Sequence, residues 1–220
     1  YGKYMVASQE AQPGAAWDYE ALLRYLCDYP AANGEQVGSI LCDDALDRAQ
    51  ALGMSGLTAL SVTDLTKVPE VVAAFDALAQ QMTATQTLQT LSTFQTVAQG
   101  TQATLAFGLD SDGISPSDWM DLGDLATQLQ AVLPESSAQL QTALQSAVVY
   151  QRAGGFRDAA TGLSVFSALH SDIEELDAYA QLATSEHYLR YLEVAASWNA
   201  PGWLQVAANQ EGLFSGDCAF

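Results

Sequence analysis

The run Tyr4-Met5-Val6-Ala7-Ser8-Gln9-Glu10 stands near the start of the chain and is followed by Pro13-Gly14 and Trp17-Asp18-Tyr19. Its apolar residues predict a β-strand over residues 4–7, and the polar Ser-Gln-Glu segment predicts a turn. Trp17 then opens a predicted helix that continues to residue 28. The chain therefore begins with a strand that leads three polar side chains into a turn.

Three further runs, in the same order along the chain, resemble segments of the clostripain-like cysteine peptidases. Gly56-Leu57-Thr58-Ala59-Leu60-Ser61-Val62-Thr63-Asp64-Leu65 is similar to the strand after a helical pair, Asp121-Leu122-Gly123-Asp124-Leu125-Ala126 to an acidic helix start, and Gly162-Leu163-Ser164-Val165-Phe166 to a Gly-Leu-Ser strand. With the opening run, they extend the resemblance over roughly residues 1–200. The chain departs from the family pattern at Ala15-Ala16 and at Ser167-Ala168. The resemblance therefore supports membership of the family more directly than it supports a particular substrate preference.

The resemblance implies an α/β fold of the caspase-like (caspase/hemoglobinase) class, mostly helical with a few strands in this part. Residues 1–200 are expected to form the C-terminal part of the peptidase domain and residues 201–220 an irregular tail. In the family the catalytic His and Cys lie in an N-terminal portion, which implies that they are upstream and absent from this chain. An upstream segment, or a second chain of the same precursor, is expected to pair along residues 4–7, because an unpaired strand exposes its backbone polar groups.

The resemblance also implies a cysteine endopeptidase that cleaves peptides or proteins after Arg or Lys. A Cys thiolate would attack the peptide carbonyl, with a His as base and backbone amides stabilising the oxyanion. The candidate substrate-binding residues are Ser8, Gln9, Glu10 and Asp18, since a carboxylate among them would pair with a basic side chain. The alternative is structural: Glu10 stabilises the turn, and Asp18 stabilises the positive end of the following helix.

A non-catalytic surface-binding or structural module on the same scaffold is the rival function. The residues encoded just upstream of this chain would distinguish the two functions. A Cys-bearing strand end there, with a His-bearing strand before it, favours the enzyme. The residues of the chain itself leave both functions open.

The cysteines and histidines supply no catalytic or metal-binding group by their spacing. Cys27 and Cys42 fall in predicted helices and Cys218 in the tail, with no second Cys or His at metal-ligand spacing and no neighbouring His or Lys to lower a thiol pKa. Buried or unreactive thiols are the simplest interpretation, and a Cys27–Cys42 disulfide is the alternative. No Cys or Ser nucleophile can be assigned to either of the two histidines, His170 and His187. No catalytic residue, metal or cofactor is therefore assigned to this chain.

Composition excludes some classes of partner. The chain has 220 residues, 49% of them hydrophobic, which is enough for a sizeable core. A net charge of -19 with only seven Lys and Arg repels phosphate backbones and anionic lipid, so nucleic-acid and membrane-surface binding are not expected. No apolar run approaches the roughly 20 residues of a spanning helix. We expect a secreted or cell-surface, bacterial-type protein, and the start without Met suggests a processed chain or a fragment.

Helical periodicity predicts further helices over residues 35–52, 67–82, 83–107, 116–132, 136–151, 171–183 and 185–196, and alternation predicts strands over 57–63 and 163–166. Ser115 is the expected cap of the fourth of these helices, and Gly53 is expected to end the first in a left-handed conformation. Residues 110–115 are expected to form a turn rather than a calcium loop, because their glycine comes too early.

Overall fold

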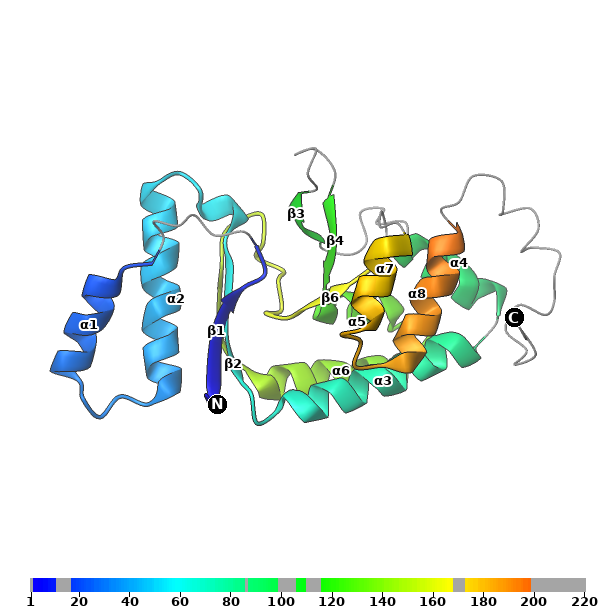
Figure 1. Cartoon of the computed structure of the whole chain (residues 1–220), viewed down its shortest axis with the longest axis horizontal. Helices are drawn as coiled ribbons and strands as arrows, with labels where there is room; N and C mark the ends of the chain where they lie inside the picture. Colours follow the sequence, from blue (N-terminus) through cyan, green and yellow to red (C-terminus); the bar gives the residue numbers. More distant parts are fainter. Residues whose placement is uncertain are drawn as a thin grey trace.

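The computed structural model describes residues 2–10, 17–85, 87–98, 106–109, 116–167 and 173–198. Its strands are β1 (Tyr4–Ser8), β2 (Ala59–Asp64), β3 (Ala106–Leu109), β4 (Pro116–Asp121), β5 (Val148–Ala153) and β6 (Ser164–Phe166). Its helices are α1 (Tyr19–Asp28), α2 (Gly34–Ala51), α3 (Val68–Ala84), α4 (Leu88–Ala98), α5 (Leu122–Leu129), α6 (Pro134–Ala147), α7 (Ile173–Ala180) and α8 (Glu186–Trp198), with a short 3₁₀ helix η1 (Ser55–Leu57). The fold is mixed α/β with helices predominating, as the sequence predicts (Figure 1).

The first sheet has the order β1-β2-β5, and both pairings are antiparallel. Helix α2 runs alongside this sheet (Figure 1), and its residues Cys42 and Ala45 form a small core with Leu60 and Val62 of β2. Gly38 allows the close approach, because a Cβ at this position would lie 2.8 Å from both methyl carbons of Val62. A residue that weakens the helix by itself therefore improves its packing on the sheet.

Strand β1 forms one edge of this sheet. At its two ends, the Lys3 carbonyl accepts a hydrogen bond from the amide of Leu65 (2.8 Å), just after β2, and the Gln9 amide donates to the carbonyl of Ala59 (2.9 Å), so odd-numbered positions face β2. Hydrogen-bonded and non-hydrogen-bonded pairs alternate along an antiparallel ladder. The backbone N–H and C=O groups of Tyr4 and Val6, which occupy the other pairs, therefore point away from β2 toward the open edge.

The second sheet has the order β3-β4-β6, again antiparallel. Beside it lies the largest core of the described residues, to which α3, α5, α6 and α8 contribute (Figure 1). Leu78, Leu125, Leu140 and Leu192, one from each helix, are completely buried. None of the helices in the described part of the chain combines the length and apolar character needed to cross a membrane.

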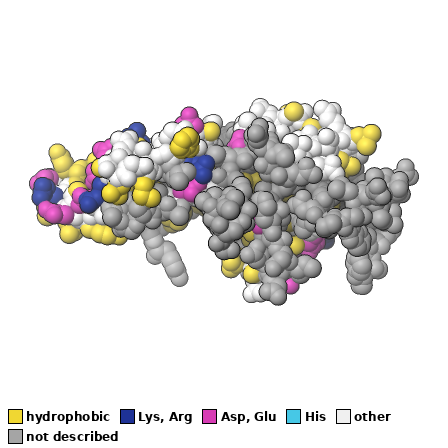
Figure 2. Space-filling view, turned by 90° about the horizontal axis from the view of Figure 1, so that it is seen from above, with side chains coloured by type: hydrophobic (Ala, Val, Ile, Leu, Met, Phe, Trp, Pro, Cys, Tyr) yellow, Lys and Arg dark blue, Asp and Glu magenta, His cyan; other side chains and the backbone are white. Residues whose placement is uncertain are grey.

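Helix α1 contrasts with this core, because none of its residues is buried. Its exposed apolar side chains include Tyr19, Leu23 and Leu26. Figure 2 shows apolar and charged side chains mixed at this end of the molecule. The helix is held by few contacts, chiefly with α2.

Three strands lie where the sequence predicts helix. β3 occupies the end of the predicted helix 83–107, β4 the beginning of 116–132, and β5 the end of 136–151. The run Val148-Val149-Tyr150 is β-branched and aromatic, which favours a strand once β2 offers a pairing edge. Pro116 is the first residue of β4, where a missing N–H is tolerated, and Asp121 caps the following helix in place of Ser115.

Other predictions are confirmed. Strands occur at the predicted segments 4–7, 57–63 and 163–166, within one or two residues at most ends, and Gly53 follows α2 with φ +70°. The predicted turn at 110–115, the helix start at 171 and the tail 201–220 lie outside the described residues.

Candidate functional site

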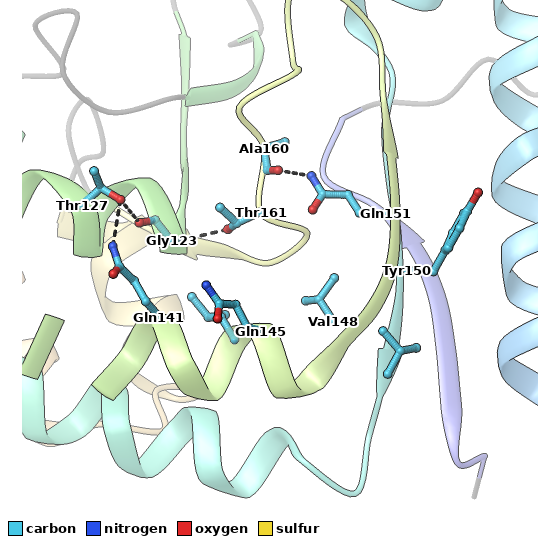
Figure 3. A pocket seen from close by; sticks show the side chains of 11 residues that line it. Gly123, Thr127, Gln141, Gln145, Val148, Tyr150, Gln151, Ala160 and Thr161 are labelled. Carbon is cyan, nitrogen blue, oxygen red and sulfur yellow. Dashed lines mark hydrogen bonds between the residues drawn. The ribbon is translucent and has the colours of Figure 1, made fainter. Parts of the chain in front are cut away.

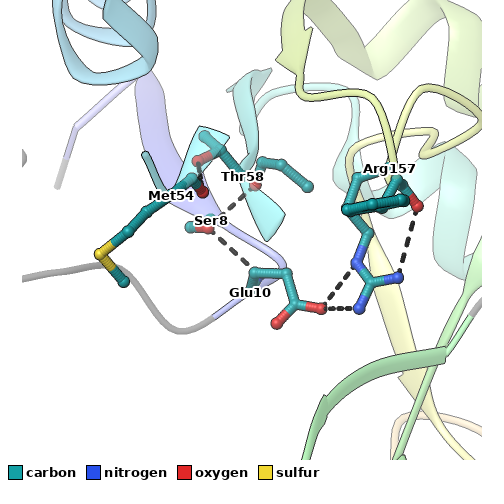
Figure 4. A network of polar contacts seen from close by, with 7 residues as sticks. Ser8, Glu10, Met54, Thr58 and Arg157 are labelled. Carbon is teal, nitrogen blue, oxygen red and sulfur yellow. Dashed lines mark hydrogen bonds and ion pairs between the residues drawn. The ribbon is translucent and has the colours of Figure 1, made fainter. Parts of the chain in front are cut away.

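The end of β1 enters the junction between the two sheets. Ser8 Oγ donates a hydrogen bond to the carbonyl of Ala59 (2.9 Å) and accepts one from the amide of Glu10 (3.1 Å) (Figure 4). The hydroxyl thus fixes the predicted Ser-Gln-Glu turn against the start of β2. This turn places the two following side chains toward different partners.

Gln9 connects β1 to the second sheet through both ends of its carboxamide. Its Nε2 donates to Asp121 Oδ2 (2.9 Å) and to Ser164 Oγ (3.2 Å), while its Oε1 accepts from the amide of Gly162 (3.0 Å). All three contacts are more than one hundred residues away in sequence. Gln9 is therefore a link between distant segments.

Asp121 is the centre of this network and is fully buried. Besides Gln9, its carboxylate accepts hydrogen bonds from the Thr161 amide (2.7 Å), the Thr161 hydroxyl (2.6 Å) and the Asp124 amide (2.9 Å). The last bond caps α5, where the helix dipole favours a negative charge. Asp121 belongs to one of the runs that resemble the family, but its place in the sequence does not predict this role. The signal that could have indicated the cap is an Asp directly before the helical segment, with a second acidic residue, Asp124, in its first turn.

A cleft of about 350 Å³ opens beside this network. Two of the four candidate substrate-binding residues, Ser8 and Gln9, line it together with Met5, Ala7, Trp119, Gly162, Leu163 and Ser164. The Trp119 side chain is 49% exposed. The cleft thus combines apolar walls with hydroxyl, carboxamide and backbone polar groups.

Glu10 forms an ion pair with Arg157, which lies in the loop between β5 and β6 (Figure 4). Its Oε1 lies 2.7 Å from Arg157 Nε and 2.5 Å from Nη2. The side chains of Glu10 and Arg157 are only 6% and 17% exposed. Glu10 therefore directly follows the cleft-lining residues Ser8 and Gln9, and its carboxylate is already paired with the guanidinium of Arg157.

Asp18 is separate from the other three candidates. Its carboxylate caps α1 by accepting from the Ala21 amide (2.9 Å), and it forms an ion pair with Arg48 of α2. The pKa of Asp18 is lowered, chiefly by the Ala21 hydrogen bond and also by Arg48. These contacts match the structural alternative for Asp18, while its role in substrate binding stays a prediction.

A second cleft, of about 630 Å³, lies between α5, α6 and β5 (Figure 3). Three carboxamides, those of Gln141, Gln145 and Gln151, line it, and none of the lining residues is charged. Gln141 Nε2 donates to Thr127 Oγ1 (3.0 Å), and Gln151 donates to the carbonyl of Ala160. Among the described residues, no three His, Cys, Asp or Glu side chains gather to hold a metal ion.

Comparison with known families decides the relationship. The model of the Clostripain family matches residues 1–199. The chain belongs to the clostripain family. The resemblance inferred from the sequence is thereby confirmed, and it covers nearly the whole chain. No curated protein matches the chain.

A solved structure, described as a B. fragilis cysteine protease, is similar to this clostripain-family chain. The TM-score is 0.57 at 16% sequence identity, and the match covers 92% of this chain and 80% of the other. At that identity the likeness concerns the fold, which is helix-rich α/β and consistent with the caspase-like class.

The clostripain-family chain does not bring its described cysteines to a histidine. Cys27 lies on α1 and Cys42 on α2, at one end of the molecule, whereas His187 lies on α8 toward the other (Figure 1). Both thiols are free, so no disulfide joins Cys27 to Cys42. Burial raises the pKa of Cys42 to about 12, with a smaller contribution from Asp43, which keeps this thiol protonated near neutral pH.

The side chain of His187 lies beside Asp76, in a hydrogen-bonded group at the start of α8. Its Nδ1 lies 3.1 Å from Asp76 Oδ1, which also accepts a hydrogen bond from Ser185 Oγ (2.7 Å). Ser185 Oγ in turn accepts from the Tyr188 amide (3.0 Å) at the start of α8. Because Ser185 is buried and bonded to the carboxylate, it is not arranged as a nucleophile for His187. His170 and Cys218 lie outside the described residues.

Proposed function

We propose that this chain is part of a cysteine endopeptidase that cleaves peptides or proteins after Arg or Lys. The catalytic His and Cys are carried by an upstream segment or by a second chain of the same precursor. The observation that carries the proposal is the position of β1, an edge strand of a clostripain-family chain whose end leads into the cleft beside Gln9.

The backbone groups of Tyr4 and Val6 support this partnership, because they point toward the open edge of the sheet. A strand added there gains hydrogen bonds that an edge otherwise leaves to water. It would end close to the cleft lined by Ser8 and Gln9. A nucleophile at the end of the added strand would thus stand near the substrate-binding residues of this chain.

In the complete enzyme, the Cys thiolate attacks the scissile carbonyl, the His transfers the proton to the leaving amine, and backbone amides stabilise the oxyanion. The present chain contributes recognition. A carboxylate, Glu10 or Asp18, pairs with the basic side chain that precedes the cleaved bond, while Ser8 and Gln9 form the wall beside it.

Substitutions at Val6 test the partnership. When the upstream segment is supplied as a separate polypeptide, Val6→Pro removes an N–H that faces the open edge and not β2, so we expect it to weaken association with that segment about 10-fold or more. Val6→Ala is the matched control, because it loses the same side-chain packing but keeps the N–H. Equal association of the two variants, measured by pull-down of a tagged upstream segment, would contradict the pairing.

Substitutions at the two carboxylates test specificity. In the complete enzyme, Glu10→Gln or Asp18→Asn at the recognising position should lower kcat/KM for Arg substrates by roughly 10- to 150-fold, from the loss of a charge-assisted contact. Cleavage of a neutral substrate should change much less. Equal losses on both substrates would assign the carboxylates to folding. Absence of thiol-dependent cleavage in a correctly assembled complex would favour the non-catalytic binding module.

We also propose that the complete protein is secreted or displayed on the cell surface of a bacterial-type cell. The acidic, globular composition agrees with this location. Fractionation of producing cells, followed by detection of the chain in the supernatant or surface fraction, tests the proposal. Detection in the cytoplasmic fraction alone would reject it.

A further inference from the structure

The open edge of β5 borders the uncharged cleft of about 630 Å³ between α5, α6 and β5. β5 pairs with β2 on one side only, because it ends the strand order β1-β2-β5. Successive side chains of a strand point to opposite faces of the sheet. The cleft touches four residues of β5 in a row, Val148–Gln151 (Figure 3). It therefore meets the strand along its open edge and not on one face alone.

The backbone of Gln151 faces this open edge. The amide of Gly154 donates to the carbonyl of Thr58 (2.8 Å). In the regular part of the ladder, the even-numbered residues Tyr150 and Arg152 are therefore the ones hydrogen-bonded to β2. Gln151 lies between them, so its N–H and C=O groups point away from β2. An extended peptide at this edge finds both a donor and an acceptor for strand pairing.

Three carboxamides supply further donors and acceptors to the cleft. Gln141 and Gln145 lie one turn apart on α6, and Gln151 lies on β5 (Figure 3). Gln141 donates to Thr127 Oγ1, and Gln151 donates to the carbonyl of Ala160. Within the described part of the chain, the Oε1 atoms of these two and the whole carboxamide of Gln145 have no hydrogen-bond partner. A carboxamide carries the same acceptor and donor types as a peptide group, so it suits a polypeptide ligand.

The lining of the cleft distinguishes between classes of ligand. It contains no charged side chain, although the chain has a net charge of -19, so it offers an ionic ligand no opposite charge. Its one aromatic residue, Tyr150, donates its hydroxyl to Asp43 Oδ1 on α2 (2.8 Å). The ring points away from the cleft (Figure 3) and is not a platform on which a sugar could stack. These properties favour an uncharged polypeptide segment over an ion or a carbohydrate.

The wall opposite β5 is held in place before any ligand binds. Thr161 lines this cleft, whereas the next residues, 162–164, line the cleft beside Gln9. The Thr161 amide donates to Asp121 Oδ2 (2.7 Å), and the Gly162 amide donates to Gln9 Oε1 (3.0 Å). A fixed wall lowers the cost of ordering the site on binding. One hydrogen-bonded segment thus separates the two clefts.

We propose that the cleft between α5, α6 and β5 binds an extended polypeptide segment with uncharged polar side chains. The segment pairs as an added strand with β5 and makes hydrogen bonds to the carboxamides of Gln145 and Gln151. This edge is the one opposite β1, so the sheet accepts a different strand at each side. The site does not depend on the proposed peptidase function, because its residues are not those that line the cleft beside Gln9.

Binding of an acetylated and amidated pentapeptide of alternating Thr and Gln to the full chain, followed by NMR titration, tests the site. Gln145→Ala should weaken binding roughly 2- to 12-fold, as expected for one neutral hydrogen bond. Gln89→Ala is the matched control, because it removes an exposed Gln side chain from another helix, α4, that does not line the cleft. The control should bind like the unsubstituted chain. Absence of binding, or an equal loss in the two variants, would overturn the proposal.

A modified peptide tests strand addition without altering the protein. The same pentapeptide, N-methylated at every residue, keeps its side chains but has no backbone donor, so it should bind at least about 10-fold more weakly. Equal binding of the two peptides would reject pairing with β5.

Other ligands test the expected chemical class. Pentapeptides in which Glu or Lys replaces Gln should bind more weakly than the uncharged peptide, and equal or tighter binding of either would overturn the assignment. Maltotriose should not bind. Binding of maltotriose that Gln145→Ala weakens would assign the cleft to a carbohydrate instead. Because these measurements need no catalysis, their results are independent of the peptidase assignment.

Discussion

The sheet β1-β2-β5 with α1 and α2 and the helical core around α3, α5, α6 and α8 are built differently. The helical core buries large side chains from every one of its helices, whereas in the other region the buried residues lie on α2 and β2 and none lies on α1, β1 or β5. In that region α1 buries nothing, and β1 keeps an open edge. The difference indicates that the helical core contributes more to stability than the sheet region does, and the edge of the sheet is where the upstream segment is proposed to pair.

Substitutions at Leu140 and Val6 should show the largest difference between the two regions in the free energy of unfolding. Leu140 of α6 is completely buried in the helical core, so Leu140→Ala should lower the free energy of unfolding by about 2–5 kcal/mol. Val6 is only partly buried, and Val6→Ala should cost about 1 kcal/mol or less. Urea unfolding of both variants measures the two values, and similar losses would remove the contrast between the regions.

The two aspartates that cap helices provide the next test. Asp121→Ala leaves buried donors of Gln9 and Thr161 without their acceptor, besides the cap of α5, so we expect a loss of about 2–4 kcal/mol. Asp18→Ala removes the more exposed cap of α1 and should cost much less. Thermal unfolding compares them. A larger loss for Asp18 would mean that α1 is more important for stability than its exposure indicates.

Adjacent glycines in the loop after β5 sharpen the comparison within the sheet region. A Cβ on Gly154 would lie 1.5 Å from the carbonyl oxygen of Ser55, whereas a Cβ on Gly155 would meet nothing within 4 Å. Gly154→Ala should therefore cost about 1–3 kcal/mol or more, and Gly155→Ala should be tolerated. Unfolding in urea measures the stability of both variants. Equal stabilities would show that η1 can shift to make room for the added methyl group.

The smallest effect concerns thiol reactivity. Cys27 is exposed and Cys42 is buried with a pKa raised to about 12, so iodoacetamide at pH 8 should modify Cys27 well before Cys42, as followed by peptide mass spectrometry. Modification of Cys42 should increase only at pH values approaching its own pKa, or on unfolding, because the thiolate is the reactive form. Rapid modification of Cys42 at pH 8 would show that α2 separates readily from the sheet.

The sequence predicts most of the helices because their apolar residues recur at helical spacing, as in α3. It misses β5, because the preceding helix α6 runs into Val148 without a glycine or proline to mark the change. It also misses the network around Asp121, since Gln9, Thr161 and Gly162 come together only through the pairing of distant strands. Ser8 and Gln9 are found by family motif and do line the cleft, whereas the partner of Glu10, Arg157, is 147 residues away and has no local signal.

Helix α6 ends at Ala147, and β5 begins at the next residue. No loop separates the two elements. The helix is anchored in the helical core, and the strand is hydrogen-bonded to β2. A displacement of β5 along β2 could not be absorbed by a connecting loop, so it would have to be accommodated by α6 or by the strand pairing itself. The position of β5 in the sheet and that of α6 in the helical core are therefore set together by one continuous stretch of backbone.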